Sequence, residues 1–193
     1  MTRGTENIMQ TEFLFAGFGG QGVMFAGQVL AYAAMDTGKE VTWIPSYGPE
    51  MRGGTANCTV VIADEEIGSP LVNNPPAIVV MNLPSLDKYE PLVKAGGVLV
   101  VNASMVDREV KRTDITSVAV PCNEIAEELG DRRMANIVAT GALLAWLPVL
   151  KLEDIEAALT AHMPGRHKHL LPKNFEALHR GAEFAKEHAR KAK

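Results

Sequence analysis

Cysteine is scarce in this chain, and that scarcity limits the redox chemistry the chain can perform alone. The 193 residues include two cysteines, Cys58 and Cys122, which lie far apart in the sequence. A chain that holds an iron-sulfur cluster by itself supplies about four thiolates, so we expect no cluster site within this polypeptide alone. Their spacing is uninformative about a disulfide. We expect both to be small, buried residues.

Long hydrophobic runs are absent as well. The sequence has no stretch of roughly 18 unbroken apolar residues, and its first residues are polar without the apolar core of a signal peptide. These features predict no membrane span, no export and a cytoplasmic location. The net charge is −4, and no basic stripe with interleaved aromatic residues occurs. Binding to nucleic acid is therefore poorly supported.

The side-chain combinations that carry catalysis within one chain are also missing. The sequence shows no Ser-His-acid order, no zinc-ligand spacing and no pair of carboxylates placed for acid-base chemistry. His162, His179 and His188 have no metal-ligand partners at suitable spacing, so we interpret them as surface or interface residues. We predict no catalytic residue and no metal ligand in this chain.

The apolar residues that are present indicate one well-filled core. They form 47% of the chain, which is enough for a single domain of this length. Apolar runs predict strands at 13–16, 40–44, 56–63, 77–81, 98–101 and 116–120, with a short return strand after a turn within 64–70. Helical spacing predicts helices at 23–34, 85–94, 123–129, 136–147 and 153–162. The predicted fold class is α/β, a Rossmann-like, mostly parallel sheet with helices on both faces.

The charge distribution sets off the C-terminal part. Residues 166–193 hold eight Lys or Arg against three Glu, a balance of +5, and residues 1–165 balance at −9. From Leu171 onward the apolar positions follow helical spacing, so we expect a basic amphipathic helix packed on the domain. Residues 166–169 read Arg-His-Lys-His. They suit a solvated loop or a contact with a phosphorylated ligand or an acidic partner. We divide the chain into a tail (1–12), a domain (13–165) and this C-terminal helix (166–193).

The most informative motif is Gly-Phe-Gly-Gly-Gln-Gly at 17–22. It follows a predicted buried strand and opens a predicted helix, which is the placement that the dinucleotide fingerprint requires. Gly17 would allow the tight turn, Gly19 the approach of a phosphate, and Gly22 the packing of the helix on the strand. Exposed N–H groups and the helix dipole there would favour an anion.

The dinucleotide interpretation also needs a carboxylate at the end of the second strand, to accept the ribose hydroxyls. That strand ends in Pro45-Ser46-Tyr47, and the nearby acidic residues, Asp36 and Glu40, should lie at its other end. Three alternatives stay open: a turn that merely needs glycines, a site for another anion, and a surface for a partner.

A second polar segment, Ser-Tyr-Gly-Pro-Glu-Met-Arg-Gly-Gly-Thr, spans 46–55. It follows the second strand, so we expect it beside the glycine turn at the edge where open α/β sheets bind ligands. The alternative is a surface loop in which Arg52 and Glu50 pair with each other. Together the two motifs give the candidate cofactor-binding residues Gly17, Gly19, Gly20, Gln21, Gly22, Tyr47, Glu50, Arg52, Gly53, Gly54 and Thr55.

The segment 136–147 is apolar almost all round and contains Gly141 and several alanines. Such a helix should be buried, and its small residues would let another backbone approach closely. It suits the core or a subunit interface.

These motifs resemble those of the gamma subunit of 2-oxoacid:ferredoxin oxidoreductases. The likeness includes 17–24, the 46–58 motif, Asp-Glu-Glu-Ile-Gly-Ser-Pro at 64–70, and the stretches 81–88, 96–102, 124–126 and 135–136. It covers residues from about 13 to 160, and several long motifs in order are hard to reach by chance. The amino-acid sequence of 46–58 most resembles that of the 2-oxoglutarate members or the branched-chain 2-oxoacid members. The segment after Gly165 is not covered.

The resemblance implies an accessory chain of an enzyme that oxidatively decarboxylates a 2-oxoacid, transfers the acyl group to coenzyme A and reduces ferredoxin. Thiamine diphosphate, Mg and the iron-sulfur clusters would belong to alpha, beta and delta partners, so the chain alone should bind none of them and be inactive. The glycine turn and the 46–55 segment would face partner subunits and the phosphates of coenzyme A. The alternative function is a stand-alone nucleotide- or coenzyme A-binding Rossmann-like domain.

Overall fold

A computed structural model describes residues 10–48 and 55–192 as a single α/β domain. The first half of the chain forms β1 (Gln10–Phe18), α1 (Val23–Asp36), β2 (Glu40–Tyr47), β3 (Thr55–Ala63), β4 (Ala77–Val80), α2 (Leu83–Tyr89) and the 3₁₀ turn η1 (Glu90–Leu92). The second half forms β5 (Val98–Asn102), β6 (Thr116–Val120), α3 (Cys122–Glu128), η2 (Arg132–Met134), α4 (Ala135–Leu144), α5 (Leu152–His162), η3 (Gly165–Leu170) and α6 (Leu171–His188).

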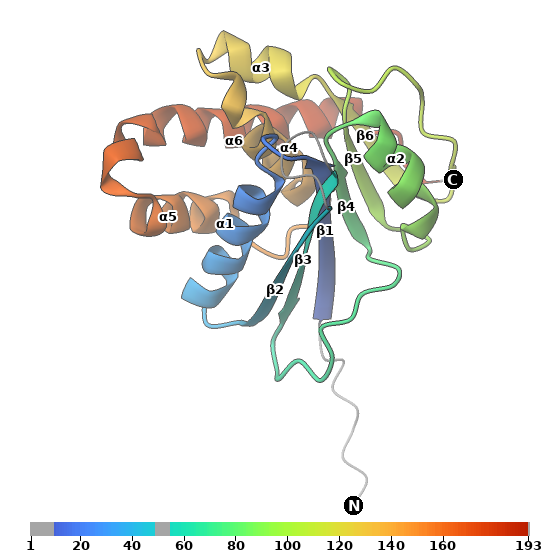
Figure 1. Cartoon of the computed structure of the whole chain (residues 1–193), viewed down its shortest axis with the longest axis horizontal. Coiled ribbons are helices and arrows are strands. Elements are labelled where there is room, and N and C mark those ends of the chain that lie inside the picture. The colour runs from blue at the N-terminus through green and yellow to red at the C-terminus, as the bar shows by residue number, and fades with distance from the viewer. Residues whose placement is uncertain (1–9, 49–54, 193) are drawn as a thin grey trace, which may run out of the picture.

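The six strands form one sheet in the order β2-β3-β1-β4-β5-β6. The pairs β1–β4, β4–β5 and β5–β6 are parallel, and β3 runs antiparallel to both β1 and β2. The prediction of a mostly parallel sheet is confirmed, with β3 as the reversed strand. Because β1 and β2 run the same way, their carboxyl ends meet at one edge of the sheet (Figure 1).

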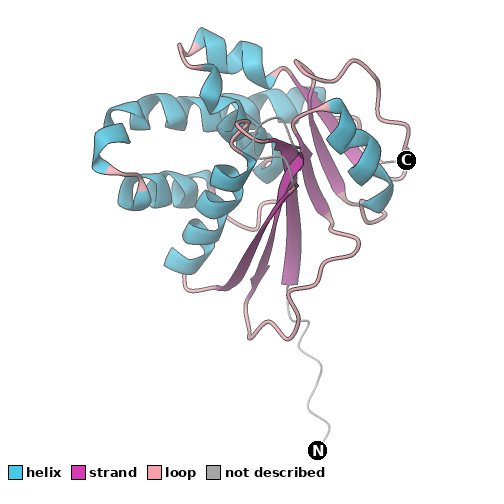
Figure 2. Ribbon diagram, viewed as in Figure 1, coloured by secondary structure: helices cyan, strands magenta, loops and turns pink. Residues whose placement is uncertain are grey.

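Helices cover both faces of the sheet (Figure 2). Side chains alternate across a strand, so Phe13 and Phe15 of β1 pack with α1, α4, α5 and α6, whereas Leu14 and Ala16 pack with α2 and the segment after β5. Strands β4 and β5 are buried at every position, as expected of interior parallel strands. Burial on both faces explains why their sequences are continuous apolar runs.

Helix α4 belongs to the core of this chain, and every residue of it is buried. Two glycines bring it against α6: a Cβ added to Gly141 would lie 1.9 Å from the Leu178 carbonyl oxygen, and one added to Gly181 would lie 2.0 Å from that of Val138. The small residues therefore allow close packing within the chain. Of the two roles open for this helix, the structure shows the core role.

The second strand is longer than predicted. It continues through Pro45 to Tyr47, and Gly48 N–H donates to the Thr55 carbonyl at 2.8 Å. In an antiparallel ladder, hydrogen-bonded and non-hydrogen-bonded residue pairs alternate. Pro45, opposite Cys58, falls in a non-hydrogen-bonded pair, so its missing N–H removes no hydrogen bond to β3. The return strand predicted within 64–70 is wrong, because described residues 64–76 form neither strand nor helix.

The ends of the described chain are both attached to the sheet. Strand β1 begins at Gln10, within the segment assigned as a tail. After α6, Arg190 forms a two-bond bridge with Ser117, so the last residues pair with the β6 edge. The basic residues 166–169 lie in η3, ahead of α6. In the described part of the chain, no helix is both long and apolar enough for a bilayer crossing.

Candidate functional site

The carboxyl ends of the adjacent strands β1 and β4 form the topological switch point of the sheet. Helix α1 follows β1 onto one face, and α2 follows β4 onto the other. The crevice outside the carboxyl ends of two such strands is the usual ligand position in open α/β sheets. The glycine turn lies at this point.

Gln21 fastens the glycine turn to both strands. Its Oε1 accepts from the Phe18 N–H at 2.7 Å and from Asn82 Nδ2 at 2.8 Å, and its Nε2 donates to the Met81 carbonyl at 2.9 Å. Asn82 in turn caps α2, because its Oδ1 accepts from the Ser85 N–H. The amide of Gln21 is thus occupied by protein groups, which assigns it to holding the turn.

The glycines of the turn have different surroundings. Gly17 is buried, and a Cβ there would lie 2.8 Å from Gln21 Oε1. Gly22 has φ 73° and accepts from Asn136 Nδ2 at 2.9 Å, so it admits that side chain from α4. Gly19 and Gly20 are exposed, and Gly20, at φ 98°, would leave a Cβ in open space. The groups available to a ligand are therefore those of Gly19 and Gly20.

A hollow of about 420 Å³, here called the switch cleft, opens beside these two glycines. It is lined by Phe18, Gly19, Gly20, Gln21, Met81, Met105, Asn123, Arg132, Arg133 and Ala135. Its size falls in the range of small-molecule sites. Helix α1 begins at Val23, two residues after Gln21 of this lining, with no acidic residue in its first turn. The helix dipole and the two arginines make this cleft suited to an anion.

The two arginines are held differently. Arg133 is bound in a fork to Asp131, with Nη2 2.6 Å from Oδ2, and these hydrogen bonds hold the pKa of the Asp131 carboxyl below its usual value. Arg132 makes a longer contact, 3.5 Å from Nε to Glu127 Oε1, and both side chains are more than half exposed. The charge of Arg132 is thus less closely paired with a carboxylate than the charge of Arg133.

The end of the second strand meets the same sheet edge. In the ladder Phe18 lies opposite Thr55, and Tyr47 lies opposite Ala56. Tyr47 is 68% exposed. The structure therefore places Tyr47 and Thr55 beside the strand end that leads into the glycine turn, although neither lines the switch cleft. Glu50, Arg52, Gly53 and Gly54 lie outside the described residues.

The carboxylate needed for a ribose is not at this edge among the described residues. Glu40 begins β2 opposite Ala63, at the far end of the sheet, as predicted. Asp36 ends α1 and its Oδ2 lies 2.8 Å from His162 Nε2. The expected position of both acids away from the turn is confirmed.

Both cysteines are free and buried. Burial raises the pKa of Cys58 to about 11, and it also raises the pKa of Cys122. Such thiols are poor nucleophiles and poor metal ligands. Among residues 10–48 and 55–192, no three His, Cys, Asp or Glu side chains gather as a metal site.

Sequence reasoning missed the residues that approach the glycine turn from elsewhere: Met81, Asn82, Asn123, Arg132, Arg133 and Asn136. A signal existed for Asn82, which follows a buried strand and precedes Pro84 as a helix cap should. Met81 and Asn136 lie in stretches that carry the family resemblance, but no local pattern places any of the remaining five beside the glycine turn.

Comparison with known proteins identifies the family. A sequence model of the pyruvate ferredoxin/flavodoxin oxidoreductase family matches residues 12–184. The chain is 39% identical over 172 residues to ketoisovalerate oxidoreductase subunit VorA of Methanothermobacter marburgensis, covering 89% of this chain and 36% of VorA. It is 38% identical over 182 residues to 2-oxoglutarate synthase subunit KorC of Methanocaldococcus jannaschii, covering 93% of this chain and 96% of KorC.

Solved structures agree with this result. The gamma subunit of a keto/oxoacid ferredoxin oxidoreductase from Geobacter sulfurreducens matches with a TM-score of 0.78 and 32% identity over 92% of this chain and 99% of that one. A 2-oxoglutarate:ferredoxin oxidoreductase from Magnetococcus marinus, solved with 2-oxoglutarate, coenzyme A and succinyl-CoA bound, shares the fold with a TM-score of 0.84. Its identity is 23%, over 95% of this chain and 32% of that one.

The chain spans about a third of VorA and nearly the whole of KorC. This protein belongs to the pyruvate ferredoxin/flavodoxin oxidoreductase family, as a gamma subunit of the 2-oxoacid:ferredoxin oxidoreductase type.

Proposed function

We propose that this chain works as one subunit of an assembly that oxidatively decarboxylates a 2-oxoacid, passes the acyl group to coenzyme A and reduces ferredoxin. The observation that carries this proposal is the match to KorC over nearly the full length of both chains. The match covers 36% of VorA, and we propose that the other parts of the enzyme lie on partner polypeptides. These would be alpha, beta and delta partners carrying thiamine diphosphate, Mg and the iron-sulfur clusters.

The proposed substrate is 2-oxoglutarate. The 46–58 motif resembles the 2-oxoglutarate members, and the KorC relative has that substrate in its name. The VorA relative, at similar identity, favours ketoisovalerate instead. Substrate contacts should lie chiefly on partner subunits, so a comparison of rates with the two acids in the assembled enzyme would separate these candidates.

The switch cleft fits a phosphate-bearing cofactor such as coenzyme A. The open space above Gly20 lets a phosphate approach the backbone, α1 begins shortly after the glycines with no carboxylate in its first turn, and Arg132 supplies a cation. We propose that Gly19, Gly20 and Arg132 hold the phosphates, with Arg133 beside them. When bound, coenzyme A supplies the thiol that accepts the acyl group.

We call the glycine turn and the polar 46–55 segment together the rim of the proposed cofactor site. Tyr47 and Thr55 lie at the same sheet edge as the turn, and the motif adds Glu50, Arg52, Gly53 and Gly54. Gln21, Gly17 and Gly22 support the rim through the contacts that fix the turn. We propose that the rim faces the partner subunits and the cofactor together.

Co-expression with chains from neighbouring genes tests the proposal. We expect a stable assembly that reduces ferredoxin when supplied with a 2-oxoacid and coenzyme A. Within it, Arg132→Ala should raise the KM for coenzyme A about tenfold, the loss of one charge-assisted hydrogen bond, with little change in assembly. Arg180→Ala is the matched control, since Arg180 pairs with Glu128 at the surface and lies outside the cleft.

Two outcomes would contradict the proposal. Failure of the chain to co-purify with any thiamine-binding partner would remove the subunit role. Saturable binding of coenzyme A or a nucleotide in the switch cleft, weakened by Arg132→Ala and with no assembly formed, would instead favour the stand-alone binding domain.

A further inference from the structure

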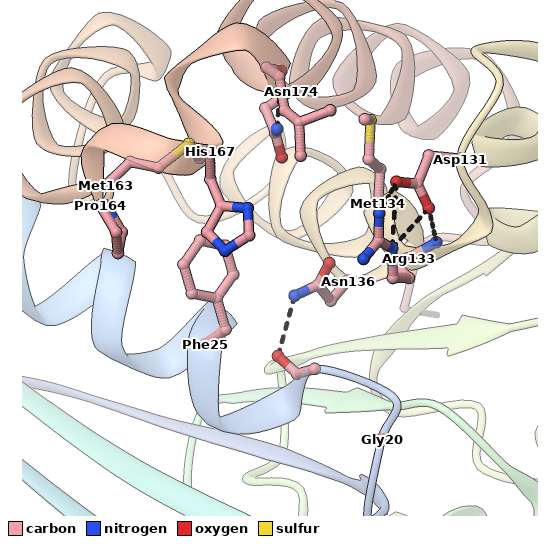
Figure 3. Close-up of a pocket in the computed structure, with 12 residues that line it drawn as sticks. Gly20, Phe25, Asp131, Arg133, Met134, Asn136, Met163, Pro164, His167 and Asn174 are labelled. Atoms are coloured by element: carbon pink, nitrogen blue, oxygen red, sulfur yellow. Dashed lines mark hydrogen bonds and ion pairs between the residues drawn. The ribbon is translucent and has the colours of Figure 1, made fainter.

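A second concave surface runs along α1 and adjoins the switch cleft, with which it shares Gly20 and Arg133. It consists of two adjoining hollows of about 320 and 340 Å³ that share Phe25, Met163, Pro164 and His167. We call the two together the α1 groove; Figure 3 shows the first hollow, with His167 and Phe25 directed into it. The floor is α1, and the far wall is formed by the end of α5 and by η3. The proposed function uses Gly20 and Arg133, where the first hollow meets the switch cleft, but not Phe25, Arg166 or His167.

The floor of the groove is unusual for a surface helix because it carries no charge. Helix α1 reads Val-Met-Phe-Ala-Gly-Gln-Val-Leu-Ala-Tyr-Ala-Ala-Met-Asp, so its one charged residue is the last. Phe25 and Tyr32 are only partly buried and lie on the groove side. Tyr32 stacks on His162 with ring centres 4.1 Å apart, and this pair closes one end of the groove. Aromatic surface of this kind suits a planar ring.

The wall of the groove carries positive charge that the described residues do not neutralise. Arg166 lines the second hollow, is exposed, and forms none of the ion pairs found within residues 10–48 and 55–192. Its Nε donates to His167 Nε2 at 3.1 Å, so the two side chains are held together at the groove. The carboxylate that lines the groove, Asp131, is already paired with Arg133 (Figure 3).

We propose that the α1 groove binds a planar aromatic ring that carries a phosphate, a ligand of the nucleoside monophosphate class. The ring lies against Phe25 and the Tyr32–His162 pair, and the phosphate meets Arg166, with His167 beside it. Charge complementarity selects an anion, and the aromatic floor selects a ring over a simple ion. This gives a role to the Arg-His-Lys-His segment that the proposed function leaves unused, and it holds independently of that function.

Titration of the full chain with adenosine 5′-monophosphate tests the proposal by calorimetry. We expect saturable binding with a Kd below about 1 mM, and a weakening of about tenfold or more in Arg166→Ala. Lys168→Ala is the matched control, because Lys168 belongs to the same exposed basic segment but lines neither hollow. Arg132→Ala should also bind normally, which separates this site from the switch cleft.

Two further probes test the two halves of the ligand. Adenosine offers the ring without the charge, and inorganic phosphate offers the charge without the ring; each should bind at least about tenfold more weakly than the monophosphate. The proposal is overturned if the monophosphate does not bind, if Arg166→Ala binds it normally, or if phosphate alone binds equally well. If the chain does not bind the monophosphate, and Arg166 in the assembled enzyme is shielded from an arginine-modifying reagent, the groove is a subunit contact instead.

Discussion

Replacing Gln21 with leucine should destabilise the chain far more than its half-exposed position suggests. The substitution keeps the approximate size of the side chain and removes three hydrogen bonds, to the Phe18 N–H, to Asn82 Nδ2 and to the Met81 carbonyl. Two of these partners are backbone groups at the ends of β1 and β4. The turn would lose its attachment to both strands.

The expected magnitude follows from these contacts. Each hydrogen bond contributes about 1 kcal/mol net, and a buried group left without a partner costs more. Met81 is 2% exposed, so water reaches it poorly even though it lines the switch cleft together with Phe18 and Gly19. We expect a loss of about 2 to 3 kcal/mol in the free energy of unfolding. For a chain of 193 residues, this corresponds to a fall in Tm of roughly 5 to 10 °C.

Thermal and urea unfolding of the full chain, followed by circular dichroism, would measure this change. Gln10→Leu is the matched control, since Gln10 donates one exposed hydrogen bond, to Glu12 at 2.9 Å. The control should change the free energy of unfolding by less than about 0.5 kcal/mol. If Gln21→Leu is as mild as the control yet weakens coenzyme A binding in the assembly, Gln21 is a ligand contact and its structural role is refuted.

Three other predictions concern the core, a buried carboxylate and the thiols. Gly141→Ala should cost about 3 kcal/mol or prevent folding, because its Cβ would overlap the α6 backbone, whereas Gly20→Ala, strained only by its φ, should cost about 1 kcal/mol in the same urea titration. Burial raises the pKa of Glu90, but hydrogen bonds from Arg108 and two backbone N–H groups outweigh it and leave that pKa lowered. The contribution of Glu90 to the free energy of unfolding is therefore complete at pH values above the pKa of about 4.3 in the unfolded chain, and it is lost as the pH falls through the lower pKa of the folded chain. Glu90→Gln should abolish this part of the pH dependence when the free energy of unfolding is measured across acid pH. Cys58 and Cys122 should resist a maleimide at about pH 7 until the chain unfolds, as mass spectrometry would show, and rapid labelling of the folded chain would contradict their burial.

The sequence predicted well what local patterns determine. The strand-turn-helix around residues 17–22 was found because glycines, an apolar run and helical spacing all occur in one short stretch. The error at 64–70 has a local cause too, since turn residues were taken to imply a returning strand with no partner assigned to it. Strand β2 was ended too early because Pro45 was treated as a breaker, although a non-hydrogen-bonded position on an edge strand tolerates it.

The convergence of distant residues on the glycine turn could not be predicted in the same way. Gln21 had been interpreted as a cofactor contact because its position in the motif says nothing of Asn82 and Met81, which approach it only after the sheet forms. Asn136 reaches Gly22 across 114 positions of sequence. Arg132 joins the switch cleft through the packing of α3 and α4, which has no local signal.

We propose that this chain completes a reaction centre built mainly by other subunits. The most direct measurement is the rate of ferredoxin reduction with 2-oxoglutarate and coenzyme A, for the purified chain and for the assembly it forms with its co-expressed neighbours. We predict turnover by the assembly and none by the chain alone. Turnover by the isolated chain, or an active assembly that forms equally well without it, would contradict the claim.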